Sequence, residues 1–181
     1  MLRHALTIPV IFFSLLAIGG SSVAIGDFGK LCLFSGISGT ITLNGEPVAD
    51  AQIKRTVSKA HTQGQKSDEA RTDGQGHFSM EPLFDRSVIG KILPMEFVVS
   101  QQMVLLYQGS EYKIWTGIKR SPEENAEARG KPLVVSCELS QEERNIDVEG
   151  SYYLTRCSWD VEPDAPRGGY APPEEDDEDD L

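Results

Sequence analysis

Alternating apolar and polar positions run through the middle of this 181-residue chain and predict short β-strands. In residues 38–43, written SGTITL, Ile41 and Leu43 alternate with polar side chains. Asn44 and Gly45 follow, and this pair readily adopts the positive φ angles of a two-residue hairpin turn. The period of two resumes after the turn, which predicts a second strand paired with the first.

Later segments repeat this pattern. The turn TDGQG leads into the short strand HFSM, and two β-rich runs flank Gly109. We expect about seven strands in all. Those after the first hairpin lie within residues 77–80, 95–118, 133–139 and 153–159. The polar, unpatterned residues 58–70 are expected to form a surface loop.

One short helix is predicted over residues 121–130. Ser121 is placed to cap its N-terminus, Pro122 fits the first turn, where an N–H has no partner, and Glu124 completes a capping box. Gly130 then ends the helix. Together the elements predict an all-β domain in which two sheets pack as a β-sandwich, with one short helix attached.

The first 24 residues have the organisation of a secretory signal peptide. Arg3 precedes an apolar stretch over residues 5–18, and small residues lead up to Ala24. A retained membrane anchor is the alternative, but the stretch is shorter than the roughly 20 residues that span a bilayer, and Pro9 interrupts it. We expect cleavage after Ala24, a β-sandwich domain over residues 25–161, and a periplasmic or secreted protein without a stable membrane span.

Export changes the interpretation of the three cysteines, Cys32, Cys137 and Cys157, because an oxidising compartment favours disulfides. Three pairings are open. Cys137 and Cys157 lie in two apolar stretches separated by a short segment, and they are our candidate disulfide. The cysteine left over is expected to be a buried structural residue, because only His61 and His77 remain as bases that might activate it.

The chain ends in a proline-rich and acidic segment, residues 162–181, which has too little apolar surface to fold and is expected to be disordered. Such a tail is either a solubilising extension or a flexible arm that captures a basic partner. Weak, unspecific binding of divalent cations is a third interpretation. The candidate partner-binding residues are one aromatic anchor and the terminal carboxylates: Tyr170, Glu174, Glu175, Asp176, Asp177, Glu178, Asp179 and Asp180.

The formal net charge is −11, which argues against nucleic-acid binding and against attraction to an anionic membrane surface. The charge is unevenly distributed. Removing the seven negative charges of residues 174–180 from the total leaves −4 for the rest of the chain. The folded part is therefore only mildly acidic, and the balance favours a basic partner.

The sequence contains no complete catalytic or metal-binding constellation, so we assign no catalytic residue, cofactor or metal. His77 lies near Asp73, which is the starting point for an acid–base pair, but a solvent-facing turn is the better explanation of both. Tyr107, Tyr112 and Trp115 fit core packing better than an exposed binding platform.

Two segments, SGTITLNGEPVADAQIKRT and RTDGQGHFSM, together resemble the prealbumin-like modules related to the regulatory domain of carboxypeptidases. The downstream pattern from Glu96 to Ser140 is similar to a family of uncharacterised bacterial proteins that also begin KLC before the first strand. The resemblance extends over about residues 30–159 and implies a seven-stranded prealbumin-like β-sandwich. It implies no catalytic motif, because the broader group resembles accessory, binding and adhesive modules.

These observations lead to one expected function and two alternatives. We expect an exported, non-catalytic binding or interaction module of the bacterial envelope, which recognises a protein partner through its loops, a sheet edge or the acidic tail. A periplasmic immunity protein that neutralises a delivered toxin is the first alternative. The second is a small hydrolase whose loop-built site would combine His77, Asp73 and a distant serine or carboxylate.

Overall fold

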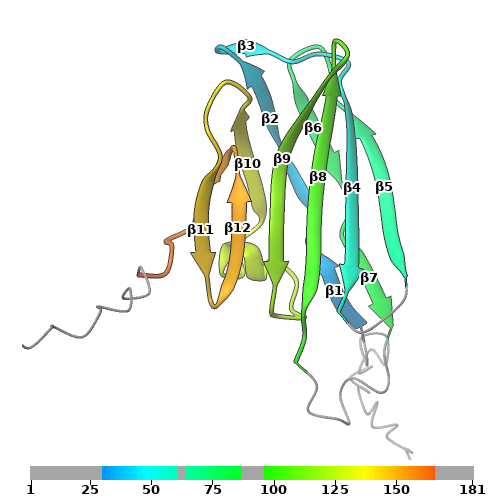
Figure 1. Ribbon diagram of the computed structural model, residues 1–181, viewed down its shortest axis with the longest axis vertical. Coiled ribbons are helices and arrows are strands. Elements are labelled where there is room, and N and C mark those ends of the chain that lie inside the picture. The colour runs from blue at the N-terminus through cyan, green and yellow to red at the C-terminus, as the bar shows by residue number, and fades with distance from the viewer. Residues whose placement is uncertain (1–29, 61–63, 87–95, 166–181) are drawn as a thin grey trace, which may run out of the picture.

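The computed structural model describes residues 30–60, 64–86 and 96–165. The predicted signal peptide and the acidic block near the C-terminal end lie outside these ranges. Within them the chain forms a sandwich-like arrangement of β-sheets, with a single short 3₁₀ turn as the helical element (Figure 1). The all-β class predicted from the alternation is confirmed.

The described residues form thirteen strands, several of which are too short or too polar to show an alternating pattern. They are β1 (Lys30–Phe34), β2 (Ile37–Leu43), β3 (Glu46–Pro47), β4 (Gln52–Lys59), β5 (Gln65–Arg71), β6 (His77–Met80), β7 (Leu83–Arg86), β8 (Val99–Tyr107), β9 (Ser110–Lys119), β10 (Leu133–Glu138), β11 (Arg144–Val148), β12 (Ser151–Thr155) and β13 (Cys157–Trp159). The 3₁₀ turn η3 (Ala126–Ala128) separates β9 from β10.

Most strands belong to one of two sheets. The larger sheet has the order β11-β12-β9-β8-β4-β5, and all its pairings are antiparallel. The smaller sheet has the order β13-β10-β2-β3, and β6 also pairs with β2. Within it β2 and β10 run parallel, whereas the other pairs are antiparallel. β1 and β7 form a separate antiparallel ribbon, at the lower right in Figure 1.

The hydrophobic core is built from the inward positions of both sheets. Ile41 of β2 and Val135 of β10 come from the smaller sheet, and Ile53 of β4 and Met103 of β8 come from the larger one. All four side chains are buried. Their burial removes apolar surface from water, which is the main force holding the two sheets together.

An aromatic cluster fills one region of this core. Trp115 is buried at its centre, and its ring centroid lies 4.9 Å from those of both Tyr153 and Trp159. Tyr107 and Tyr112 are partly buried and pack against the core. The aromatic residues of β8 and β9 are therefore packing residues, as the sequence indicated.

The first hairpin is confirmed at its turn but is much shorter than predicted. Asn44 and Gly45 have φ angles of 54° and 81°, and the carboxylate of Glu138 accepts their N–H groups at 2.8 Å and 2.9 Å. β2 and β3 then pair over only two residues each. The next strand, β4, crosses to the larger sheet and pairs with β5 and β8. Pro47 has no N–H to extend the ladder, and Asp50 has a φ of 56° at the corner between β3 and β4.

Residues 65–70, which the sequence predicts to be part of a surface loop, belong to the edge strand β5 instead. β5 pairs with β4 along its whole length. Apart from Ala70, its side chains are charged or polar and mostly exposed. A sheet edge needs only backbone groups for pairing, and charged side chains there discourage association with other chains, so no apolar alternation is required.

The helix predicted over residues 121–130 is wrong in extent, because only η3 is helical. Ser121 Oγ accepts the N–H of Glu123 at 3.2 Å, which closes a local turn and not a helix. Asn125 precedes η3 with a left-handed φ of 62°, a conformation that interrupts a right-handed helix. Gly130 ends the segment with a φ of 84°, in the role predicted for it.

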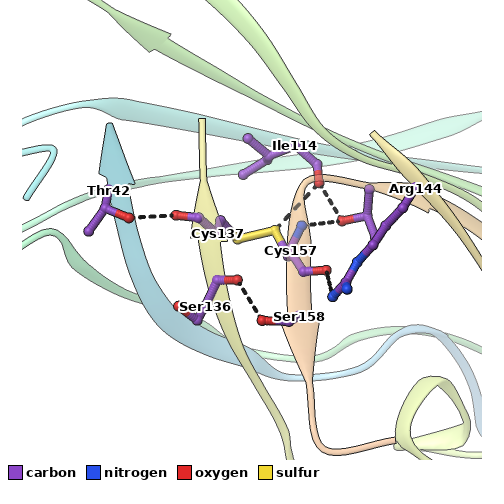
Figure 2. The surroundings of a disulfide bond; sticks show 8 residues. Thr42, Ile114, Ser136, Cys137, Arg144, Cys157 and Ser158 are labelled. Carbon is purple, nitrogen blue, oxygen red and sulfur yellow. Dashed lines mark hydrogen bonds between the residues drawn. A yellow bond between two sulfur atoms is a disulfide. The ribbon is translucent and has the colours of Figure 1, made fainter. Parts of the chain in front are cut away.

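The candidate disulfide between Cys137 and Cys157 is confirmed (Figure 2). It joins directly opposed residues of β10 and β13. Only Arg156 separates β12 from β13, so the chain passes here from the larger sheet into the smaller one. Thr155 Oγ1 donates to the carbonyl of Ile114 at 2.7 Å and accepts the N–H of Cys157 at 3.0 Å. The disulfide therefore fastens the segment that connects the two sheets.

Candidate functional site

Four polar side chains are enclosed together beside the aromatic cluster. We call them the buried polar cluster, which consists of Ser35, Gln101, Lys119 and Glu127, all with no exposed surface. They come from four separate segments: the link after β1, the middle of β8, the last residue of β9 and the turn η3. Burying polar and charged groups is unfavourable unless each group has hydrogen-bond or ion-pair partners inside the protein.

The carboxylate of Glu127 lies at the centre of the cluster. Its Oε2 accepts hydrogen bonds from Ser35 Oγ at 2.5 Å and from Lys119 Nζ at 2.6 Å. Its Oε1 accepts the N–H of Ser35 at 3.2 Å and Nε2 of Gln101 at 2.9 Å. Each oxygen therefore has two donors, which replaces the hydration that the carboxylate loses on burial.

The other members also have further partners. Lys119 Nζ donates to the carbonyl of Glu123 at 2.9 Å. Gln101 Nε2 donates to the carbonyl of Leu33 at 2.8 Å, while its Oε1 accepts the indole N–H of Trp115 at 3.1 Å. The network thus extends from the ion pair to the aromatic cluster.

Electrostatics favour the ionised form of this pair. Burial alone raises the pKa of Glu127, but the Lys119 ammonium and the hydrogen bonds from Lys119, Ser35 and Gln101 outweigh that effect and hold the pKa below its usual value. The site is therefore a buried ammonium–carboxylate pair.

Cys32, the free cysteine, lies next to the cluster. Its Sγ is 3.7 Å from Ser35 Oγ, and the side chain is buried. Burial raises the pKa of the thiol to about 11. The thiol is therefore protonated at neutral pH, and the expectation of a buried structural cysteine is confirmed.

Backbone contacts hold η3 against the rest of the site. The N–H of Asn125 donates to Ser35 Oγ at 2.7 Å, and the N–H of Gly130 donates to the carbonyl of Asn125 at 2.8 Å. Trp159 Nε1 donates to the carbonyl of Glu127 at 2.9 Å. The irregular segment is thus positioned by side chains from other elements, which is why a helix is not needed there.

A second buried charge adjoins the cluster. Arg55 of β4 is fully buried and pairs with Asp68 of β5 through Nε at 3.0 Å and Nη2 at 2.6 Å. Its Nη1 donates to the carbonyl of Ser35 at 3.3 Å, and its guanidinium lies over the ring of Phe34. Arg55 thereby connects the buried polar cluster to the edge strand β5.

Asp73 and His77, the pair on which the hydrolase alternative depends, lie at the exposed turn that leads into β6, and His77 is the first residue of that strand. His77 Nδ1 is 3.4 Å from Asp73 Oδ2, and both side chains are more than half exposed. Asp73 Oδ1 accepts the N–H groups of Gln75 at 2.8 Å and His77 at 2.9 Å, and the N–H of His77, followed by that of Gln75, lowers the pKa of Asp73. These are the contacts of an Asx turn, and no serine contact accompanies them in the described ranges.

The chain after the last strand is fastened to the turn between β11 and β12. The carboxylate of Asp164 accepts the N–H groups of Glu149 and Gly150, both at 3.1 Å, and pairs with Arg129 Nη2 at 2.6 Å. The N–H of Asp164 donates to the carbonyl of Asp147 on β11 at 2.8 Å. β11 is an edge of the larger sheet, and the end of the described chain lies beside it in Figure 1.

The tail residues proposed to bind a partner begin beyond this anchor. Tyr170 and the acidic residues from Glu174 to Asp180 lie outside the described residues. Ala165 is the last described residue before them.

The sequence reasoning missed the buried polar cluster, although one signal pointed to it. Gln101 lies on the same inward face of its strand as Val99 and Met103. Lys119 lies on the same face of its strand as Trp115. A polar residue on the apolar face of a strand indicates a buried partner. Glu127 carried no such signal, because it belongs to an irregular segment.

The described part of the chain contains no helix that is long and apolar enough to cross a membrane. Among the same residues, no three His, Cys, Asp or Glu side chains converge in a way that could hold a metal ion.

A family model described as "Domain of unknown function (DUF6795)" matches residues 37–142. The matched segment includes three members of the buried polar cluster, Gln101, Lys119 and Glu127, and begins just after Ser35. No curated protein matches the chain, and no solved structure does.

Proposed function

Since this chain belongs to the DUF6795 family over more than half of its length, and the family has no assigned function, we propose a function from the structure: an exported, non-catalytic module that binds a basic protein partner through its acidic tail. The observation that carries the proposal is the anchoring of Asp164. Four hydrogen bonds, one of which is also the ion pair with Arg129, fix the chain at this residue near the end of the described range.

Charge and position agree in this proposal. Residues 174–180 carry seven negative charges, and such a block attracts a basic surface over a distance of about 8 Å at physiological ionic strength. The anchor also lies beside the edge strand β11, and a sheet edge is a surface to which a partner can add a strand.

Three further parts of the proposal are supported by other observations. The buried polar cluster has no exposed surface, which fits a domain that does not process an external substrate. The disulfide fits a periplasmic or secreted protein, delivered by the signal peptide predicted over residues 1–24. Two facing sheets of mainly antiparallel strands fit a prealbumin-like sandwich.

The test compares three forms of the mature protein as baits for envelope extracts. One is residues 25–181, the second ends after Ala165 so that Asp164 keeps its contacts, and the third keeps full length but carries Asn or Gln at the seven acidic positions 174–180. Bound proteins are identified by mass spectrometry, and the affinity of each purified candidate is then measured by calorimetry at low and at physiological salt.

We expect a basic protein that binds the first form and is lost from both others, with an affinity that falls as salt rises. The charge-neutralised form is the matched control, because it separates charge from tail length. Equal binding to all three forms would move recognition onto the sandwich, and the tail proposal would then be wrong. A candidate whose affinity does not respond to salt would also contradict it.

A further inference from the structure

The buried polar cluster and its neighbour Trp115 bring together four chemical groups that are usually kept apart. Lys119 supplies an amine, Glu127 a carboxylate, Gln101 a carboxamide and Trp115 an N–H donor. The four side chains are all buried, with at most 1% of any residue exposed. An amine can attack a carboxamide carbon when a third group moves the protons, so the set contains every reactant for amide exchange.

The geometry arranges these groups in the required order. Glu127 holds Lys119 Nζ on Oε2 at 2.6 Å and Gln101 Nε2 on Oε1 at 2.9 Å, so one carboxylate contacts both the attacking and the leaving nitrogen. The two partners are also close in the sheet. Gln101 pairs with Gly117, and Lys119 is two residues further along β9, which makes Gln101 and Lys119 diagonal neighbours on one face.

The carbonyl oxygen of the carboxamide has a suitable partner as well. Trp115 Nε1 donates to Gln101 Oε1 at 3.1 Å. A hydrogen bond at this position polarises the carbonyl and stabilises the negative charge that forms on its oxygen during attack. In a site with no exposed surface, such a fixed donor is more effective than in solution.

We propose that the domain forms an intramolecular amide bond between Lys119 Nζ and Gln101 Cδ, with release of ammonia. The site is a self-modification site, and this inference is independent of the function proposed above. The bond covalently joins the adjacent strands β8 and β9 in the centre of the larger sheet.

The atoms and charges balance without a further reactant. Glu127 takes a proton from the ammonium of Lys119, and the freed lone pair attacks Gln101 Cδ while the carbonyl electrons move to Oε1. Glu127 then gives a proton to Nε2 and takes one from the attacking nitrogen. The C–Nε2 bond breaks, ammonia leaves with that electron pair, and the C=O bond re-forms. One C–N bond replaces another, no group is oxidised, and Glu127 keeps the remaining proton.

The surroundings favour the product. Before the reaction the core contains an ion pair, and ionised groups in a low-dielectric interior carry a large desolvation penalty. Afterwards the amide and the protonated carboxyl are both neutral. Released ammonia is diluted into solvent, whereas water, which would hydrolyse the carboxamide, is excluded from a site with no exposed surface.

The experiment is an intact-mass measurement on the folded, disulfide-reduced mature protein after overnight incubation, followed by tryptic mapping. We expect a mass lower than that of the sequence by one ammonia molecule. Ring closure of the backbone at Asn44-Gly45 would release ammonia too, so the residues that lost it must be identified by peptide mapping. The linkage joins peptide 92–113 to peptide 114–120 and prevents cleavage after Lys119, which fragmentation of the branched peptide identifies.

Two substitutions on neighbouring positions give a matched comparison. With Gln101→Glu the same bond forms by loss of water instead of ammonia, whereas Gln102→Glu, on the exposed face of β8, leaves the loss of ammonia unchanged. Glu127→Gln, which removes the proton carrier, leaves the full sequence mass. If that variant fails to fold, the first two variants alone decide.

Two results would overturn the proposal. One is a folded protein of full sequence mass whose chain is cleaved after Lys119. The other is a loss of water from the unsubstituted protein that maps to Glu127, since this would place the bond on the carboxylate and not on Gln101.

Discussion

Removal of the disulfide between Cys137 and Cys157 is expected to lower the free energy of unfolding by about 3 kcal/mol. The two residues are 20 positions apart and directly opposed on β10 and β13. In the chain-entropy model, a closed loop of this length restricts the unfolded chain by about 3 kcal/mol at 25 °C. At about 3 °C per kcal/mol for a chain of this size, Tm should fall by about 10 °C.

The double substitution Cys137→Ala and Cys157→Ala is best made in a Cys32→Ala background, so that no thiol is left to mispair. The reference is the Cys32→Ala protein with its disulfide intact. Urea unfolding followed by tryptophan fluorescence measures the difference, because Trp115 is buried against Trp159 in the folded state. The urea dependence, m, should also rise, since an unlinked denatured chain exposes more surface.

The reduced reference protein serves as a control for the substitutions themselves. Its midpoint should coincide with that of the double variant, because both lack the same constraint. A loss of stability with unchanged m would place the effect in folded-state packing and not in chain entropy. A midpoint that does not move at all would refute the reasoning.

Four further predictions concern single positions. Ser35→Ala removes one hydroxyl donor from the buried carboxylate of Glu127 and should destabilise the protein by about 2 kcal/mol in the same urea assay. Hydrogen bonds from Ser140 and then from the Asn44-Gly45 turn hold the pKa of Glu138 at about 2. Its contribution to stability is therefore present above about pH 4.5 and is lost as the pH falls toward 2. Glu138→Gln should flatten this part of an acid-unfolding curve. Gly39→Ala would drive a Cβ into the backbone carbonyl of β10 and should cost about 3 kcal/mol or more, visible as a large fall in Tm. With a pKa of about 11, the Cys32 thiol should react with iodoacetamide at pH 8 at least about 100-fold more slowly in the folded protein than in urea.

The parts of the fold that the sequence predicted share one property: their side chains alternate because one face is buried. β2, β6, β8 and β10 all show this pattern, and each was predicted close to its observed position. β5 showed no alternation, because an edge strand pairs through its backbone and its polar side chains form ion pairs and hydrogen bonds with neighbouring strands. The turn at Asn44-Gly45 was predictable from local chemistry, whereas the departure of β4 to the other sheet was decided by packing across the whole domain.

The predicted helix failed for a related reason. Ser121, Pro122 and Glu124 formed a local capping signal, but the segment that follows is determined by distant partners such as Ser35 and Trp159. The same limit applied to the site, since Lys119 and Glu127 lie on different elements and no local pattern shows that they form an ion pair. The disulfide could be predicted from the sequence because its two cysteines lie on strands with a clear apolar pattern.

The parallel pairing of β2 with β10 has a consequence for how the protein is made. It joins residues 37–42 to residues 133–138. The second neighbour of β10 is β13, which is synthesised later still. Pairings between distant parts of a chain form slowly, because the intervening loop has to close before any contact is gained. A growing chain therefore leaves one edge of β2 unpaired until most of the domain exists, although β3 and β6 can already pair with its other edge. The proposed export requires the protein to cross a membrane before it folds, and this delay keeps the chain unfolded for translocation. During the same interval the apolar side chains of β2 are exposed, so the chain needs a chaperone.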